Sequence, residues 1–277
     1  MRLVAGCDGG GTKCAVRVAR VNDANEIAEV GTGVAGGANV STDFETAVQN
    51  ICSATRDALA SIGAAPDTTV ESFVAALAGS TRVSHDHLRE RLQAELNIKR
   101  VKIVPDVAVL FAAAGVSPPA LATIVGTGSI AWRVAKSGKT FRAGGEGPTD
   151  SDHGSGFWIG RESVRRGLIR ADLGETSTPQ ESARFSAEAF SRRGELGVDS
   201  LLDEAATHIA ELILDVSQQA RRDLVSCPWV CAGGVAVNQK EWMELVRTKC
   251  SEKGCELPEP IFVKDPVIGA QRMAVEL

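Results

Sequence analysis

The chain of 277 residues is 44% hydrophobic and 23% charged, the composition of a globular protein that is long enough to form two lobes. A net charge of −5 and an isoelectric point near 5.5 give no reason to expect nucleic acid or an anionic membrane as a partner. The amino-terminal apolar stretch is too short for a secretory signal and no window has the length of a membrane span, so we expect a cytoplasmic protein.

The first predicted element is a hairpin in the stretch "LVAGCDGGGTKCAVRV", residues 3–18. Its turn contains three consecutive glycines, preceded by Asp8 and followed by Thr12 and Lys13. Uncovered amide groups beside a hydroxyl and an ammonium form the kind of donor surface that holds phosphate. An ordinary glycine-rich hairpin explains this stretch equally well on its own, and the order of Thr12 and Lys13 excludes a Walker loop.

Apolar periodicity then predicts alternating helices and strands, an α/β arrangement. The elements expected in this half are strands at 2–7 and 13–21, a helix at 42–61, a strand at 71–79, a helix at 84–96, a strand at 101–106 and a helix at 107–115. Thr42 and Glu45 match a capping box at the start of the first helix. We assign residues 1–115 to a first lobe.

The pattern restarts after the proline pair at 118–119. Residues 121–135, "LATIVGTGSIAWRVA", again join two apolar strands through a turn of glycines and hydroxyls. The later expected elements are helices at 158–171, 182–192, 201–225 and 239–253, strands near 231 and at 260–264, and a terminal helix from 269. We assign residues 116–277 to a second lobe and leave open whether the terminal helix returns to the first.

The second turn also fits a dinucleotide-binding fingerprint, through Gly126, Gly128 and Ala131, with Glu146 twenty residues after Gly126. That fingerprint requires a helix to begin at the turn, whereas the following residues alternate like a strand. A Rossmann site is therefore not expected. Two lobes that each present such a turn are instead expected to close on one phosphate chain from two sides.

The seven cysteines predict reduced, buried or incidental thiols. Their number is odd, and a disulfide framework is unusual in so long a chain. The pairs Cys227/Cys231 and Cys250/Cys255 have three and four intervening residues, which favours thiols over a metal site.

Seven short motifs in order carry a resemblance to a known family over nearly the whole chain. They are "DGGGTK" at 8–13, "GGAN" at 36–39, "LAG" at 77–79, "PD" at 105–106, "GTGS" at 126–129, "DHGSGFWIGR" at 152–161 and "AGGVAVN" at 232–238. Together they resemble the N-acetylglucosamine kinase and BadF/BadG/BcrA/BcrD ATPase family of the actin-like ATPase and sugar kinase superfamily. The resemblance implies an α/β fold with two ribonuclease-H-like lobes and ATP in the cleft between them.

The same resemblance implies a role for individual residues. The phosphates of ATP would contact Gly10, Gly11, Thr12, Lys13, Gly126, Thr127 and Gly128, and the nucleoside would contact Gly233, Gly234 and Asn238. The sugar would contact Asn39, Gly79, Ser80 and Asp152. A small-molecule sugar is the expected partner, and whether the chain forms a homodimer stays open.

Two carboxylates are candidates for the chemistry. Asp8 is expected to hold Mg²⁺ through water, since Mg²⁺ keeps several waters and few carboxylates; the alternative is an aspartate that only bonds its own turn. Asp106 matches the general base of the family, which would accept the proton of the attacking hydroxyl. A plain helix N-cap is the alternative for Asp106, because it lies between an apolar strand and an apolar helix.

The chain departs from the family pattern at residues 146–153. Glu146 stands in place of a tryptophan, polar residues at 149–151 replace an apolar pair and glycine, and His153, which we expect to be solvated, replaces a glutamate. An acidic wall near the sugar suggests free glucosamine as the substrate, because a carboxylate pairs with ammonium. Helical material of the relatives is also missing between about 172 and 200.

Three functional hypotheses follow. The first is an ATP-dependent kinase for an amino sugar, N-acetylglucosamine or glucosamine. The second is a non-catalytic ATP-binding or regulatory protein of the same fold, suggested by the altered segment 146–153. The third is an iron–sulfur activator of the BadF type, which the absence of cysteines between Cys52 and Cys227 disfavours.

Overall fold

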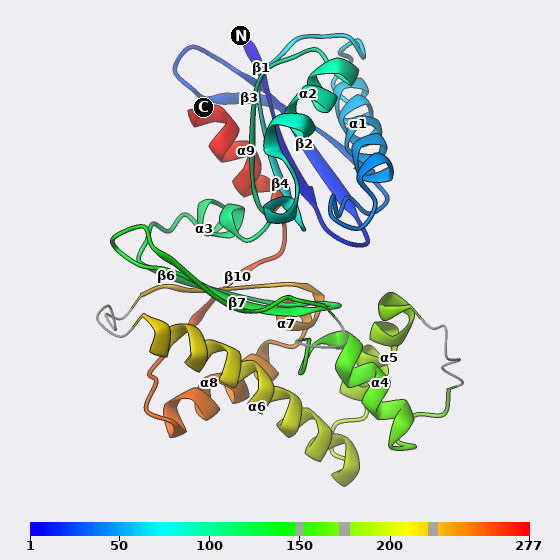
Figure 1. Cartoon of the computed structure of the whole chain (residues 1–277), viewed down its shortest axis with the longest axis vertical. Helices are drawn as coiled ribbons and strands as arrows, with labels where there is room; N and C mark the ends of the chain where they lie inside the picture. Colours follow the sequence, from blue (N-terminus) through cyan, green and yellow to red (C-terminus); the bar gives the residue numbers. More distant parts are fainter. Residues whose placement is uncertain (148–151, 172–177, 221–226) are drawn as a thin grey trace. The chain divides into compact units, whose positions relative to one another are not determined.

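The computed structural model describes residues 1–147, 152–171, 178–220 and 227–277, which form two compact units (Figure 1). One unit comprises Met1–Gly115 and Asp265–Leu277, and the other comprises Val116–Lys264. Each has a five-stranded mixed sheet with helices, so the predicted α/β fold of two lobes is confirmed. Among the described helices, none has the length and apolar character needed to cross a membrane.

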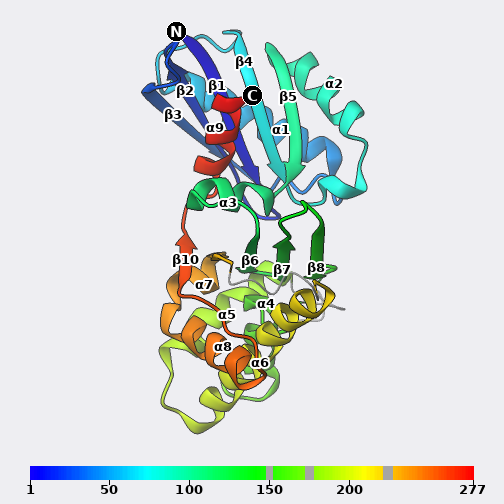
Figure 2. The ribbon, with the colours of Figure 1, turned by 90° about the vertical axis from the view of Figure 1, so that its left-hand side faces the viewer.

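The first sheet has the order β3-β2-β1-β4-β5, with its strands side by side in Figure 2. Its strands are β1 (Arg2–Gly9), β2 (Cys14–Val21), β3 (Ile27–Ala35), β4 (Val70–Leu77) and β5 (Ile98–Pro105). β1, β2 and β3 pair antiparallel, whereas β4 and β5 continue parallel to β1.

The second sheet repeats this topology. Its strands are β6 (Ala120–Val125), β7 (Ser129–Val134), β8 (Thr140–Gly144), β9 (Trp229–Ala232) and β10 (Pro260–Val263). Its order is β8-β7-β6-β9-β10, with an antiparallel meander followed by two parallel strands. The restart of the pattern predicted from the sequence therefore corresponds to a structural repeat.

Helices cover both faces of the first sheet. They are α1 (Phe44–Ala60), the 3₁₀ turn η1 (Ser80–Arg82), α2 (His85–Glu95), α3 (Ala108–Ala114) and α9 (Val267–Glu276). Leu3, Ala5 and Cys7 of β1 face the core with α1 and α2, and Val4 faces the core with α3 and α9. Because side chains alternate along a strand, Asp8 lies on the same face as Val4, the face of α9.

The helices of the second unit form one core with its sheet. They are α4 (Gly156–Arg165), α5 (Pro179–Ser191), α6 (Leu196–Gln219), α7 (Gly234–Asn238) and α8 (Lys240–Glu252). Trp229 of β9 and Trp242 of α8 are fully buried, and their indole N–H groups donate to Thr123 Oγ1 and to the Leu202 carbonyl, both at 2.9 Å.

Several details differ from the predictions. The capping box of Thr42 and Glu45 is wrong: Asp43 is the N-cap of α1 and accepts from the Thr46 N–H at 3.1 Å. Helix α4 begins at Gly156 because the Ser155 hydroxyl caps it. Strands β3 and β8 were not predicted, and α6 begins at Leu196 rather than at 201.

Two other predictions are confirmed. A strand, β7, follows the turn at 126–128, so the helix that a Rossmann fingerprint requires is missing there. The cysteines are free thiols, all buried except the half-buried Cys255.

Candidate functional site

The glycine turn between β1 and β2 forms the edge of the candidate site in the first unit. The Gly10 N–H donates to the Lys13 carbonyl at 2.9 Å, which closes the turn. Gly11, Thr12 and Lys13 are exposed at its tip. The turn therefore presents backbone, a hydroxyl and an ammonium to the surroundings, the donor types that bind phosphate.

Backbone hydrogen bonds join this turn to the two segments expected at the sugar. The Ala38 N–H donates to the Gly10 carbonyl at 2.8 Å, and the Ala78 N–H donates to the Gly9 carbonyl at 2.8 Å. The Val40 N–H in turn donates to the Ala78 carbonyl at 3.2 Å. The first unit thus brings together three segments that lie far apart in the sequence.

Asn39 and Gly79 meet where these segments join. Asn39 Oδ1 accepts from the backbone N–H of Ser41 at 3.1 Å and from its hydroxyl at 2.8 Å. Gly79 has a φ of 77°, and a Cβ there would lie 2.4 Å from Ser41 Oγ and 2.5 Å from Asn39 Oδ1. A side chain at position 79 is therefore excluded by both conformation and space.

Ser80 follows Gly79 but turns its side chain into the unit. It is buried, and its hydroxyl donates to the Val104 carbonyl of β5 at 3.3 Å. This bond links the segment of Gly79 to the end of β5, immediately before Pro105 and Asp106. Only the backbone of Ser80 is then available to a ligand.

Three carboxylates interact in the first unit: Asp8, Asp106 and Asp265. Burial, followed by the negative charges of Asp106 and Asp265, raises the pKa of Asp8 to about 7, against the opposing effect of Lys13. Asp106 accepts from the Val107 N–H at 2.9 Å through Oδ1 and precedes α3, whose N-cap is Val107. The role of Asp106 as the general base stays a prediction beside the alternative of a helix cap.

Asp265 is a residue that sequence reasoning missed. It precedes α9, and Arg17 Nη1 lies 3.7 Å from its Oδ2. The sequence shows only an aspartate before a helix, and its electrostatic contact with Asp8 depends on α9 packing against β1. Asp8 and Asp106 are half-buried, whereas Asp265 is exposed. Among the described residues no three such groups come together as direct metal ligands, so a divalent cation that offsets this charge would be bound largely through water.

In the second unit, α4 braces the turn between β6 and β7. The Gly156 N–H donates to the Gly126 carbonyl at 2.8 Å, and the Phe157 N–H donates to the Thr127 carbonyl at 3.1 Å. The Gly126 N–H donates to the Gly128 carbonyl at 2.9 Å. The carbonyl groups of the turn are thereby occupied inside the unit.

Asp152 supports the same turn. Its Oδ1 accepts from the Ser129 N–H at 3.0 Å, it is 8% exposed, and burial raises the pKa of its carboxyl. A Cβ at Gly128 would lie 3.0 Å from this carboxylate, so the missing side chain lets the two approach closely. The structure brings Asp152 to the turn, and its contact with sugar stays a prediction.

The residues expected at the nucleoside adjoin the turn of the second unit. Gly233 precedes α7, and a Cβ at Gly126 would lie 3.7 Å from both Gly233 Cα and Gly234 N. Asn238 is exposed at the end of α7, where its amide donates to the Gly234 carbonyl at 2.8 Å. These three residues form one surface with Gly126.

Glu146 follows β8 and is exposed, and its contact with sugar stays a prediction. The polar substitutions at 149–151 lie outside the described residues. His153 is exposed as expected, but its ring also contacts His208, with centroids 5.0 Å apart.

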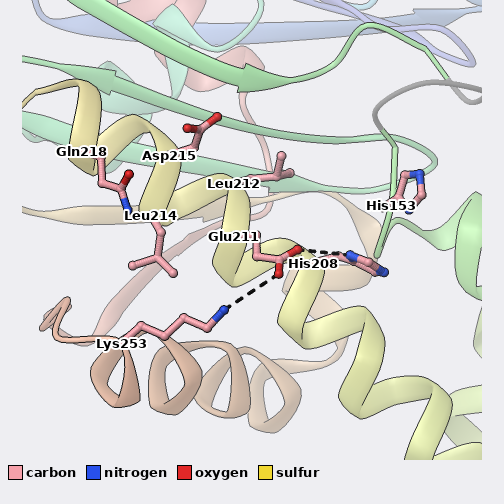
Figure 3. Close-up of a pocket in the computed structure, with 8 residues that line it drawn as sticks. All are labelled: His153, His208, Glu211, Leu212, Leu214, Asp215, Gln218 and Lys253. Carbon is pink, nitrogen blue, oxygen red and sulfur yellow. Dashed lines mark hydrogen bonds and ion pairs between the residues drawn. The ribbon is translucent and has the colours of Figure 1, made fainter.

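Both histidines line a cavity of about 570 Å³ along α6 (Figure 3). His208 Nδ1 lies 3.4 Å from Glu211 Oε2, and Glu211 Oε1 lies 3.8 Å from Lys253 Nζ. None of the residues predicted at the site lines this cavity.

The comparisons with known proteins concern the family and the fold. The sequence profile of the BadF/BadG/BcrA/BcrD ATPase family matches residues 5–274. No curated protein matches the chain significantly.

Among solved structures, a proposed N-acetylglucosamine kinase from Chromobacterium violaceum is similar, with a TM-score of 0.70, 19% identity and 99% of each chain covered. A proposed N-acetylglucosamine kinase from Porphyromonas gingivalis has a TM-score of 0.67 and 20% identity, over 100% of this chain and 99% of that one. A ROK family glucokinase from Streptomyces griseus, solved with glucose and AMPPNP, has a TM-score of 0.61 and 17% identity, over 99% and 100%. At these identities the likeness establishes the fold.

Proposed function

The chain belongs to the BadF/BadG/BcrA/BcrD ATPase family, and we propose that it is a kinase that transfers a phosphoryl group from ATP to a hydroxyl of an amino sugar. The observation that carries the proposal is the hydrogen bonding of Ala38 to Gly10 and of Ala78 to Gly9. It joins the turn assigned to phosphate to both segments assigned to sugar. The fold shared with sugar kinases and proposed N-acetylglucosamine kinases supports the same conclusion.

In this proposal the two glycine turns bind the phosphates of ATP. Gly10, Gly11, Thr12 and Lys13 act from the first unit, and Gly126, Thr127 and Gly128 act from the second. Gly233, Gly234 and Asn238 bind the nucleoside beside the second turn. Thr12 and Lys13 add a hydroxyl and a positive charge to the backbone donors, which suits an anionic ligand.

Asp106 accepts the proton of the sugar hydroxyl as the oxygen attacks the terminal phosphorus and ADP leaves. Asp8 would hold Mg²⁺ through water. Its pKa is raised mainly by burial and further by the charges of Asp106 and Asp265, and a bound cation would offset that negative charge. Bound Mg²⁺ would neutralise charge on the phosphate oxygens. Asn39 and the backbone of Gly79 and Ser80 orient the sugar, with Asp152 contributing from the second unit.

The acceptor class is an amino sugar, and Glu146 favours free glucosamine over N-acetylglucosamine. A carboxylate near the sugar would pair with the ammonium group of glucosamine, which the acetamide lacks. Phosphorylation of N-acetylglucosamine with no phosphorylation of glucosamine would contradict this preference.

The test is release of ADP from Mg·ATP in the presence of glucosamine, N-acetylglucosamine, N-acetylmannosamine, glucose or no sugar. We expect one amino sugar to stimulate release. Asp106→Asn should lower the stimulated rate at least about 100-fold, because proton transfer by a positioned base contributes on that scale. Asp57→Asn, an exposed carboxylate on α1, is the matched control and should leave the rate unchanged.

Two outcomes would overturn the kinase assignment. Thermal stabilisation by ATP without stimulation by any sugar would favour a non-catalytic ATP-binding protein. A coloured, iron-containing protein after anaerobic purification would favour an activator of the iron–sulfur type.

A further inference from the structure

The side-chain amide of Asn39 has a defined orientation. A backbone N–H can only donate, so the Asn39 atom that lies 3.1 Å from the Ser41 nitrogen must be an acceptor, which is Oδ1. The Ser41 hydroxyl lies 2.8 Å from the same oxygen and adds a second donor. With Oδ1 engaged twice, Nδ2 is turned away from Ser41 and presents its two N–H donors.

The backbone on both sides of Asn39 is fixed as well. The Ala38 N–H bonds the Gly10 carbonyl and the Val40 N–H bonds the Ala78 carbonyl, so the residue is anchored to the first glycine turn and to the end of β4. The Asn39 carbonyl accepts from the Thr42 N–H at 3.2 Å and from the Asp43 N–H at 3.3 Å. If the side-chain amide of Asn39 flipped, these backbone hydrogen bonds would prevent the backbone from rotating to return the N–H donors to their former direction.

Gly79 closes the remaining side. Because a Cβ at this position would overlap Ser41 Oγ and Asn39 Oδ1, the segment that carries Gly79 packs directly on the hydrogen-bonded pair. The pair, which belongs to one of the segments assigned to the sugar in the proposed function, is therefore covered by the other.

We propose that Ser41 is a positioning residue that holds the Asn39 amide with its donors toward the sugar, so that the sugar group facing Asn39 is a hydrogen-bond acceptor, a hydroxyl or carbonyl oxygen. An ammonium group has no lone pair to accept these donors. The inference rests on the proposed function and adds a residue and a chemical requirement to it. The amine of an amino sugar is accordingly bound elsewhere in the site.

The kinetic test compares two variants at position 41. Ser41→Ala removes the hydroxyl donor, and we expect the KM for the stimulating sugar to rise about 3- to 10-fold, the scale of one hydrogen bond, with kcat and the KM for ATP unchanged. Ser41→Thr keeps the hydroxyl and should restore the wild-type KM. Thr42→Ala, the neighbouring hydroxyl that does not contact the Asn39 side chain, is the matched control and should have no effect. An unchanged KM in Ser41→Ala would overturn the inference.

A further variant replaces the amide of Asn39 itself by a carboxylate. Asn39→Asp keeps the acceptor that Ser41 needs but removes both donors. We expect its melting temperature to stay close to that of the wild type, while sugar binding measured by calorimetry without ATP weakens at least 10-fold. Binding at wild-type strength would show that the sugar does not need the donors.

A spectroscopic readout separates this inference from the proposed function. The side-chain ¹⁵N–¹H resonances of Asn39, identified by their absence in Asn39→Asp, should be those of an ordered amide in the sugar-free wild type and should broaden or shift toward mobile values in Ser41→Ala. Unchanged resonances would overturn the positioning role whatever the enzyme phosphorylates. An ordered amide that responds to Ser41→Ala, in a protein that no sugar stimulates, would uphold the positioning role and overturn the kinase assignment.

Discussion

Asp8 illustrates how the first unit concentrates charge at one residue. Its carboxylate is partly buried at the end of β1, and the charges of Asp106 and Asp265 act on it in the same sense as burial. Lys13 opposes them more weakly. The cation-free protein therefore holds Asp8 protonated at pH values where an exposed aspartate is ionised.

This environment predicts an unusual pH dependence of stability. An acid with a folded-state pKa near 7 and an unfolded-state pKa near 3.8 binds more protons when folded, so its contribution to the free energy of unfolding falls as pH rises between these values. The slope from this one group is at most about 1.4 kcal/mol per pH unit. Asp8→Asn should remove it, as measured by urea unfolding without divalent cation between pH 5.5 and 7.5.

Glu71→Gln provides the control for that experiment. Lys99 lowers the pKa of the half-buried Glu71, so its contribution to stability is lost only at acidic pH. The slope of this variant above pH 5.5 should equal that of the wild type. Parallel curves for the wild type and Asp8→Asn would show that the Asp8 carboxyl is ionised throughout.

At the scale of elements, close packing without side chains holds α9 in place. A Cβ at Gly6 of β1 would lie 2.1 Å from the Gln271 nitrogen of α9, and a Cβ at Gly269 of α9 would lie 1.9 Å from the Val109 carbonyl of α3. The helix therefore lies against both the strand that ends near Asp8 and the helix that follows Asp106. It packs against the elements that carry or adjoin the two carboxylates.

Gly6→Ala should disturb this packing. The added methyl group meets backbone atoms that cannot rotate away, so α9 must move, at a cost of about 1–3 kcal/mol or more. Thermal unfolding should begin several degrees lower. Gly36→Ala is the matched control, because the new Cβ would meet the far end of the Asn50 side chain at 3.0 Å, and it should cost much less. Equal melting temperatures for the two variants would contradict the tight contact.

The same packing explains which elements the sequence predicts. Continuous apolar runs identify β1 and β6, which are buried on both faces, and apolar alternation identifies β2 and β7, along which burial alternates. It fails for β3, where Gly31 and Gly33 face α1 so closely that a Cβ would lie about 2 Å from its carbonyls, and where Val30 and Val34 are exposed. At Gly31 and Gly33 the inward face of this strand consists of backbone, so it has no apolar side chains there for a hydropathy pattern to detect.

Helix starts show a similar limit. A hydroxyl followed by glutamate three residues later predicts a capping box at Thr42, but the adjacent Asp43 provides the cap. Both residues are good caps, and the choice depends on the Asn39 carbonyl, which binds the Thr42 and Asp43 N–H groups. That tertiary arrangement cannot be seen in local sequence.

At the scale of the whole chain, the candidate site depends on a repeated topology that local motifs reveal only in part. The two glycine turns occupy equivalent positions, each between the first two strands of a sheet. The motifs therefore identify the turns and strand ends correctly. The motifs do not identify Asp265, because it is distant in sequence from β1 and belongs to the first unit only through the return of α9.

Because α9 returns to the first unit, we expect the two units to differ in whether their continuous segments fold alone. Residues 116–264 are continuous in sequence and have their own core, so they should fold when produced alone.

Residues 1–115 lack α9, which supplies Ala270 and Ala274 to the core on one face of the first sheet. We expect residues 1–115 alone to unfold without cooperativity and to bind a hydrophobic dye. Fusing residues 265–277 after Gly115 through a flexible linker should restore a cooperative transition, measured by circular dichroism, because the helix again covers that face. A cooperative transition of residues 1–115 alone, at the same midpoint as the fusion, would show that α9 is dispensable for the first unit and that its role is confined to bringing Asp265 near Asp8.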